Sequence, residues 1–164
     1  MTSTIFYDME LPQQVNRIWR LLRQTRDTFL KKVQGALAEW DLSVAEIGVL
    51  SVLHHRPQPV VVTDIARLLM EKPQTMVGML DRMESKGLVQ RFRDQQDRRL
   101  VRVEATEKGK RLYESASPTV DNDIERLLSV LNAGELNQLE GMLEKLRSSG
   151  LEALGIEYRR VETE

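Results

Sequence analysis

The stretch that decides the fold runs from Val62 to Glu107 and reads VTDIARLLMEKPQTMVGMLDRMESKGLVQRFRDQQDRRLVRVEATE. Apolar residues recur at helical spacing in two runs, one from Thr63 to about Met70 and a second that ends at Gly87. A tight break at Glu71–Gln74 separates the two runs. Two runs of alternating apolar and polar residues follow, joined by the polar tip Asp94–Arg98. This order of helix, turn, helix and hairpin predicts a winged helix-turn-helix.

Signals on either side extend the helical pattern. An apolar stripe predicts a long helix over residues 11–39, and Ser43 with Glu46 three residues later predicts the start of the next helix. The β-branched run 60–62 predicts a third strand beside the hairpin. Thr63 or Asp64 is expected to cap the helix that follows this strand.

Downstream of the hairpin, a helix is expected from Thr106 to about Leu131, with a bend at Pro118. Asn132 is expected to cap the last helix, and Gly150 is expected to end it. In the hairpin, strands are expected over residues 88–93 and 99–105.

The chain has 164 residues, few aromatic residues and no cysteine. Its length suits one domain, or one domain with an assembly element, and its pattern predicts a mainly α fold with a small β-hairpin wing. The absence of cysteine excludes a disulfide framework, a thiol redox sensor and a thiolate metal site. No apolar run approaches the roughly 20 residues of a membrane span, and the N-terminal residues lack a signal-peptide pattern, so we expect a cytoplasmic protein without a membrane partner.

The net charge of −1 hides an uneven distribution. Residues 67–111 hold twelve Lys and Arg against seven Asp and Glu, a net charge of +5, whereas residues 112–164 hold five against eleven, a net charge of −6. Basic charge concentrated on the helix-turn-helix and hairpin is typical of a phosphate-binding face. The alternative is a solvated surface on which the charge is merely uneven.

The end helices carry more apolar surface than a chain of this size easily covers, which predicts a homodimer joined through both ends; the alternative is a self-contained bundle. At LDRMESKGLVQR (80–91), DRRLVRVEATEKGK (97–110) and RIWR (17–20) the sequence resembles the MarR family of bacterial transcription regulators, and within it the SlyA-like branch. The combination of D-x-R, a return strand and T-E-K-G is specific, although each piece alone is weak. The resemblance implies a triangular homodimer, with dimerisation helices at 1–40 and 112–164 and a winged helix-turn-helix lobe at 41–111.

The second helix of the lobe is expected to enter the major groove of DNA, where each base pair shows a distinct pattern of donors and acceptors. Gln74 and Thr75 stand at its start, where side chains reach base edges, although helix capping is an alternative role for both. Gly78 departs from the family, which often has a basic side chain there, and a glycine at this position allows closer approach of the backbone to DNA. The predicted contacts on this helix are Gln74, Thr75, Val77, Gly78 and Arg82.

The tip of the hairpin is expected to reach the minor groove, because a narrow A·T-rich groove attracts arginine. We predict that Arg99 inserts there, oriented by a salt bridge to Asp97, with Arg98 as the adjacent alternative. The other arginines of the hairpin are expected to contact phosphate or to be plain surface charges: Arg91, Arg93 and Arg102. A two-fold dimer would bind double-stranded DNA at a pseudo-palindromic operator with half-sites about one helical turn apart.

Family members of this type commonly bind small aromatic or phenolic acids between the dimer helices and the lobe. The resemblance places Arg17, Ile47, Ser51 and Met79 around such a slot, and an arginine fork suits a carboxylate. The alternative is that Arg17 pairs with a neighbouring acid while the other three belong to the core. Ile47 and Ser51 depart from the SlyA-like pattern, so the identity of a small aromatic acid does not carry over.

Neither a metal site nor a catalytic site is predicted. His54 and His55 are adjacent, so on a helix they point about 100° apart and are poorly placed to share a metal ion. Phosphate-binding, dinucleotide-binding, zinc-protease and nucleophile-elbow motifs are absent, so we expect no enzyme and no cofactor. The sequence predicts a homodimeric, sequence-specific DNA-binding transcriptional regulator, a repressor released by a small aromatic or phenolic ligand. A winged-helix module that binds protein without binding DNA is the alternative.

Overall fold

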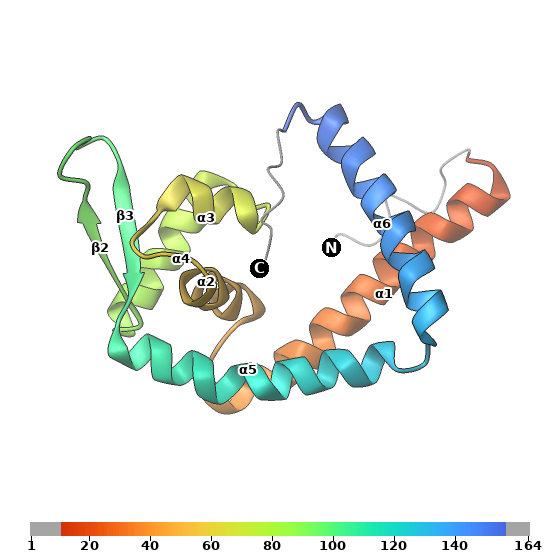
Figure 1. The fold of residues 1–164 in the computed structure, drawn as a ribbon, viewed down its shortest axis with the longest axis horizontal. Helices are drawn as coiled ribbons and strands as arrows, with labels where there is room; N and C mark the ends of the chain where they lie inside the picture. Colours follow the sequence, from red (N-terminus) through yellow and green to blue (C-terminus); the bar gives the residue numbers. More distant parts are fainter. Residues whose placement is uncertain (1–10, 157–164) are drawn as a thin grey trace, which may run out of the picture. The chain divides into compact units, whose positions relative to one another are not determined.

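Helices dominate the computed structural model, which describes residues 11–156. In chain order the elements are α1 (Gln13–Leu37), a 3-10 turn η1 (Ala38–Trp40), α2 (Val44–His55), β1 (Val60–Val61), α3 (Val62–Leu68), α4 (Pro73–Ser85), β2 (Val89–Arg93), β3 (Val101–Ala105), α5 (Glu107–Leu128) and α6 (Ala133–Ala153) (Figure 1). Contacts divide the chain into two compact units, one ending at Ile124 and the other beginning at Glu125. The mainly α class with a small antiparallel sheet is as predicted. Within the described residues, no helix has the length and apolar character of a membrane span.

The sheet has the strand order β1-β3-β2, and both pairings are antiparallel. Val103 at the centre of β3 pairs with Val60 on one side and with Arg91 on the other. The predicted third strand is therefore confirmed for Val60 and Val61, whereas Val62 already belongs to α3. The return strand begins at Val101, two residues later than expected, so Arg99 lies in the turn of the wing.

The core of the first unit lies between α2, α3, α4 and the inner face of the sheet, and Figure 1 shows α3 and α4 beside the β2–β3 hairpin. Met76, Leu80 and Met83 are fully buried, which confirms the stripe predicted for the second helix of the lobe. Other elements contribute fully buried side chains to the same core, among them Leu50, Leu53, Ile65 and Val103. Burial on this scale fixes which side of α4 faces inward.

Local capping signals set several of the helix ends. Ser43 and Asn132 each form a capping box with the glutamate three residues later, as predicted. Gly87, with a φ of 70°, ends α4 as predicted, because the left-handed conformation lets the Gly87 N–H donate to Glu84 O at 2.8 Å and the Leu88 N–H donate to Met83 O at 2.9 Å.

Three predicted helix boundaries were wrong. Val61, not Thr63 or Asp64, is the N-cap residue of α3, and no side chain caps that helix. Gly150 lies inside α6, which continues to Ala153 and is followed by Gly155 at a φ of 63°. Helix α5 ends at Leu128 and not near Leu131, and it runs without a break through Pro118.

The junction between the wing and α5 is unusually close. The Thr106 hydroxyl accepts from the Gly109 N–H at 3.1 Å and donates to Gly87 O at 2.7 Å, so one side chain caps α5 and ties it to the end of α4. Gly109 is buried against Leu88, and a Cβ added there would lie 2.1 Å from Leu88 O. Only glycine fits at this position, which explains the glycine of the T-E-K-G sequence.

Gly109→Ala is therefore expected to lower the free energy of unfolding by about 1–3 kcal/mol, as overpacking against a fixed backbone usually does. Urea unfolding at one protein concentration measures the change. Gly35→Ala is the matched control, because an added Cβ meets nothing within 4 Å there and alanine favours helix by up to about 1 kcal/mol. Equal or greater stability of Gly109→Ala would contradict the close packing of α5 on Leu88.

Candidate nucleic-acid interface

The start of α4 leaves its first side chains free to face solvent. Lys72 is the N-cap residue, Pro73 occupies the first helical position, and no side chain caps the helix. Gln74 and Thr75 follow as the second and third helical residues, and both are exposed. The alternative that Gln74 or Thr75 serves as the helix cap is therefore wrong.

The outward side of α4 brings the other predicted helix contacts together. Val77 and Arg82 are exposed on it, while Met79 points to the core. A Cβ added to Gly78 would meet only Nη1 of Arg82, at 4.0 Å, so the surface at Gly78 is open. This side offers amide, hydroxyl, methyl and guanidinium groups over a backbone that another molecule can approach closely.

The Asp94 carboxylate organises the tip of the wing. It accepts the backbone N–H groups of Gln96 and Asp97, both at 2.8 Å, and it pairs with the Arg102 guanidinium. These hydrogen bonds lower the pKa of Asp94 from 3.8 to about 2, and the largest contributions come from the Asp97 N–H and the Arg102 side chain. Arg102 also donates to Pro59 O at 3.2 Å, so it fastens the wing to the segment before β1.

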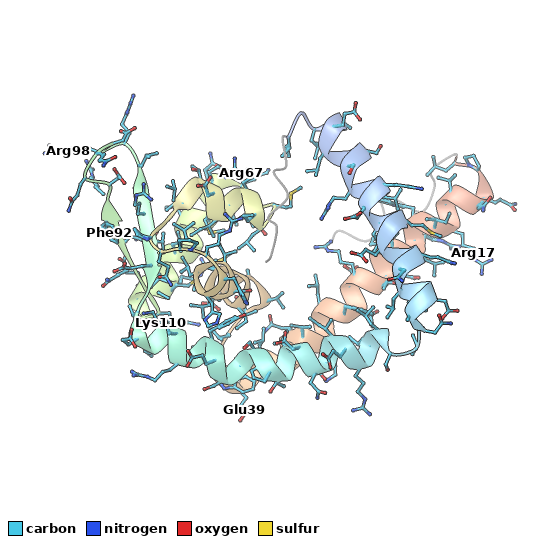
Figure 2. All side chains as sticks on the ribbon, in the orientation of Figure 1. Arg17, Glu39, Arg67, Phe92, Arg98 and Lys110 are labelled. Carbon is cyan, nitrogen blue, oxygen red and sulfur yellow. The ribbon has the colours of Figure 1, made fainter. Side chains whose placement is uncertain are left out.

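Two arginines project from this ordered tip. Arg99 lies against Asp97, with Nε 3.1 Å from Oδ1, and its side chain is 91% exposed. The same Asp97 oxygen accepts the Arg99 backbone N–H at 3.0 Å, so the predicted Asp97–Arg99 pair is present. Arg98 is also exposed, and Figure 2 shows its side chain pointing outward from the tip. The tip therefore presents two exposed guanidinium groups, one of them paired with Asp97.

Arg91 behaves differently from the tip arginines. Its guanidinium donates to the carboxylates of Asp81 and Glu84 on α4, with both closest contacts at 2.6 Å, and only 23% of its side chain is exposed. Arg93, by contrast, is exposed. The pairing of Arg91 with Asp81 and Glu84 was not predicted from the sequence. Two acidic residues three apart on a helix, followed by a strand that carries an arginine, are the pattern that could have indicated it.

The residues predicted to hold a ligand are not gathered at one place within the chain. Ile47 and Met79 are 7% and 4% exposed and belong to the core. Ser51 is half-buried and accepts a long hydrogen bond from Tyr113 Oη at 3.5 Å. Arg17 is exposed about four turns before Val33, the first buried residue of α1, which puts it roughly 24 Å along the helix (Figure 2).

The two histidines take part in ring contacts at the end of α2. The His54 ring lies 4.6 Å from that of Tyr113, and His55 Nδ1 lies 3.0 Å from Ser51 O. Between residues 11 and 156, no cluster of three or more His, Cys, Asp or Glu side chains is arranged to hold a metal ion.

The low pKa of Asp94 gives the wing tip a defined response to acid. A carboxyl whose pKa is depressed on folding stabilises the folded state above its unfolded pKa, near 3.9, and loses this effect as the pH falls toward about 2. We expect the carboxyl carbon of Asp94 to titrate near pH 2 by NMR, and Asp94→Ala to speed hydrogen exchange at the Gln96 and Asp97 amides at neutral pH. Asp121→Ala, on the exposed side of α5, should leave both amides unchanged. A midpoint near 4 for Asp94 would contradict the carboxylate-centred tip.

Comparison with known proteins agrees with this geometry. The model of the MarR family matches residues 42–101. An uncharacterized HTH-type transcriptional regulator of Bacillus subtilis, YfiV, is 27% identical over 136 residues, which cover 81% of this chain and 82% of YfiV. CouR from Rhodococcus jostii, solved with p-coumaroyl-CoA, is 30% identical with a TM-score of 0.71 over 79% of this chain and 90% of CouR. MepR of S. aureus, solved in complex with DNA, is 26% identical with a TM-score of 0.76 over 85% of this chain and 99% of MepR. The chain belongs to the MarR family of winged helix-turn-helix transcriptional regulators.

Proposed function

We propose that this regulator acts as a homodimeric repressor that binds a pseudo-palindromic operator. One observation carries the DNA part of the proposal. The open side of α4, with Gln74, Thr75 and Arg82, and the wing tip, with Arg98 and Arg99, belong to one lobe joined by direct contacts between α4 and β2. A helix face and a basic hairpin held together in this way suit the simultaneous reading of a major and a minor groove.

On this proposal, each side chain has a separate task. The Gln74 amide can bond adenine and Thr75 can contact a thymine methyl, while Arg82 reaches guanine or a phosphate. At Gly78 the helix backbone lies open to a base pair. Arg99, oriented by Asp97, enters the minor groove, and Arg93 adds a phosphate contact. Val77 completes the apolar part of the helix surface.

Selection from random duplexes tests the DNA proposal. We expect enrichment of an A·T-rich palindrome, bound with an affinity that falls steeply with salt because counterions are released. Arg99→Ala should weaken binding about tenfold per half-site and relax the A·T preference. Arg111→Ala, an exposed arginine of α5 outside both the predicted DNA contacts and the dimerisation region proposed below, is the matched control and should bind normally. Absence of any salt-dependent duplex binding would instead favour the protein-interaction module.

The second unit supports the dimer. Its residues form an apolar groove of about 590 Å³, lined by Leu128, Leu136, Asn137, Leu139, Glu140, Leu143, Glu144 and Arg147. Helix α1 also exposes a run of large apolar side chains toward its N-terminal end: Val15, Ile18, Trp19, Leu21 and Leu22. Exposed apolar surfaces of this extent usually mark interfaces. We therefore propose residues 1–40 and 112–164 as the dimerisation region, and residues 41–111 as the DNA-binding lobe.

A charge placed in the groove should break the dimer. Leu143→Glu is expected to convert the protein to a monomer at micromolar concentration and to weaken operator binding more than tenfold, because only a dimer engages both half-sites. Sedimentation velocity and a binding titration measure the two effects. Met70→Glu replaces an apolar side chain that is 56% exposed in the lobe, outside the proposed dimerisation region, and it should remain dimeric. A monomeric wild type would overturn the proposed dimer.

Repression through occupancy of a promoter is the mode we propose, and a small aromatic or phenolic ligand would release the DNA. CouR, which was solved with p-coumaroyl-CoA, supports a ligand of this class. We place Ser51, which lies beside Tyr113 and one turn after Ile47 in α2, on the lobe side of such a site, together with Met79 on the core-facing side of α4. For Arg17 the proposal requires that dimerisation brings an α1 helix to the lobe. A SlyA-like placement within the family and a cytoplasmic location are part of the same proposal.

Release is tested with a panel of aromatic acids and their thioesters, p-coumaroyl-CoA among them. An active ligand should raise the melting temperature of the protein and lower its affinity for the selected operator, because it binds one conformation better than the other. Ser51→Leu should abolish both effects while leaving DNA binding intact. A panel in which no compound changes either quantity would remove ligand release from the proposal.

A further inference from the structure

Arg91 belongs to β2 of the wing, but its side chain donates hydrogen bonds to carboxylates of α4. Its Nη2 lies 2.6 Å from an oxygen of Asp81 and 2.6 Å from one of Glu84, and its Nε lies 3.1 Å from the same Glu84 oxygen. The second Glu84 oxygen accepts the Arg91 backbone N–H at 3.1 Å. Glu84 therefore holds both the main chain and the side chain of one β2 residue.

This contact differs from an ordinary surface pair. The Arg91 side chain is only 23% exposed, and Glu84 is engaged at both carboxylate oxygens. The side-chain and backbone hydrogen bonds from Arg91 hold the pKa of Glu84 below its usual range. A planar fork bound at two or more points fixes direction as well as distance, which a lysine ammonium does not do.

Asp81 shows why the pairing matters for DNA. It follows Gln74 and Gly78 at helical spacing and is itself exposed, so it belongs to the outward side of α4. An unpaired carboxylate on that side would repel phosphate. Arg91 supplies the compensating charge from the neighbouring strand.

We propose that Arg91 is a positioning residue, which locks the wing to α4 so that the helix and the tip reach their two grooves together, and that it does not itself bind phosphate. The inference rests on the proposed DNA-binding function and deepens it. It also separates Arg91 from Arg93 and the tip arginines, which sequence alone places in one group.

Charge-conserving substitution separates the two roles. If Arg91 only contacts phosphate, Arg91→Lys should bind like the wild type, and Arg91→Ala should reduce the salt slope by about 0.9 per half-site. If Arg91 positions the wing, both variants should bind about tenfold more weakly, and Arg91→Lys should do so although it keeps the positive charge. Circular dichroism and hydrogen exchange of the α2 amides verify that each variant keeps its core.

The partner residue gives a test in which plain electrostatics predicts the opposite sign. Glu84→Ala removes a negative charge beside the DNA-binding surface, which by itself should tighten DNA binding. Loss of positioning should weaken it about tenfold instead. Glu71→Ala is the matched control, because Glu71 is an exposed acid of the turn before α4 and takes part in no ion pair seen within residues 11–156.

A double-mutant cycle between Arg91 and Arg99 completes the test. In the wild type, Arg99→Ala should lower the affinity for DNA about tenfold. In the Arg91→Ala background the same substitution should lower the affinity less than about threefold, because a wing that is not held on α4 no longer places Arg99 in the minor groove. Additive losses and an Arg91→Lys protein that binds like the wild type would overturn the inference while leaving DNA binding established. Failure of the wild type to bind any duplex would overturn the proposed function and this inference with it.

Discussion

Burial of one side of α4 is the constraint on which the lobe depends. Met76, Met79, Leu80 and Met83 occupy that side and are nearly or fully buried. Each contributes roughly 1.5–3 kcal/mol, so together they supply an amount comparable to the whole stability of a small domain. A rotation of α4 by one residue would expose part of this stripe. The outward set from Gln74 to Arg82 is therefore fixed by what lies on the opposite side of the helix.

Polar contacts then set the details that burial leaves open. Glu46 is buried at the start of α2, which disfavours its charge, yet hydrogen bonds from Ser43 and Lys86 outweigh that cost and lower its pKa. Lys86, at the end of α4, lies 3.1 Å from Glu46 and also donates to Asp41 O at 2.8 Å. Partly exposed ion pairs contribute little stability, typically below about 1 kcal/mol, so their main effect here is to align neighbouring elements.

The features predictable from sequence were those with a local cause. The Ser43 and Asn132 capping boxes and the glycine stop at Gly87 depend on residues within one turn of each other, and each was predicted correctly. The end of α3 could not be predicted in this way. It closes with the same hydrogen-bond pattern as α4, but Met70 and not a glycine takes the left-handed position, with a φ of 55°, so the sequence carries no glycine to mark the helix end. Gly150 gave the opposite error: it was predicted to end α6 but lies inside the helix, because a helix tolerates glycine in its interior.

In the candidate DNA-binding surface, too, local contacts were predictable from the sequence and long-range contacts were not. The Asp97–Arg99 pair spans two residues and was predictable, whereas the pairing of Arg91 with Asp81 and Glu84 depends on how the wing folds back on α4. Arg17 lies on α1 away from Ile47, Ser51 and Met79, and on the proposed function only a second chain would bring an Arg17 to the lobe, which no spacing rule reports. Composition indicated that the segment was basic, but only the fold distinguishes the arginines engaged within the lobe from those that remain exposed.

The proposed attachment of the wing to α4 would constrain the operator as well. On the proposed mode of binding, the distance between the bases read by the helix and the groove entered by the tip would be a fixed property of each half-site, while the distance between half-sites would be a property of the dimer. Inserting one base pair within a half-site shifts the two contacts by about 3.4 Å along the duplex, so one of them must be lost. Such a protein would reject sites that contain the right bases at the wrong internal spacing. Operator mutations would then fall into two classes: substitutions that weaken one contact, and insertions that abolish all contacts with one of the two grooves.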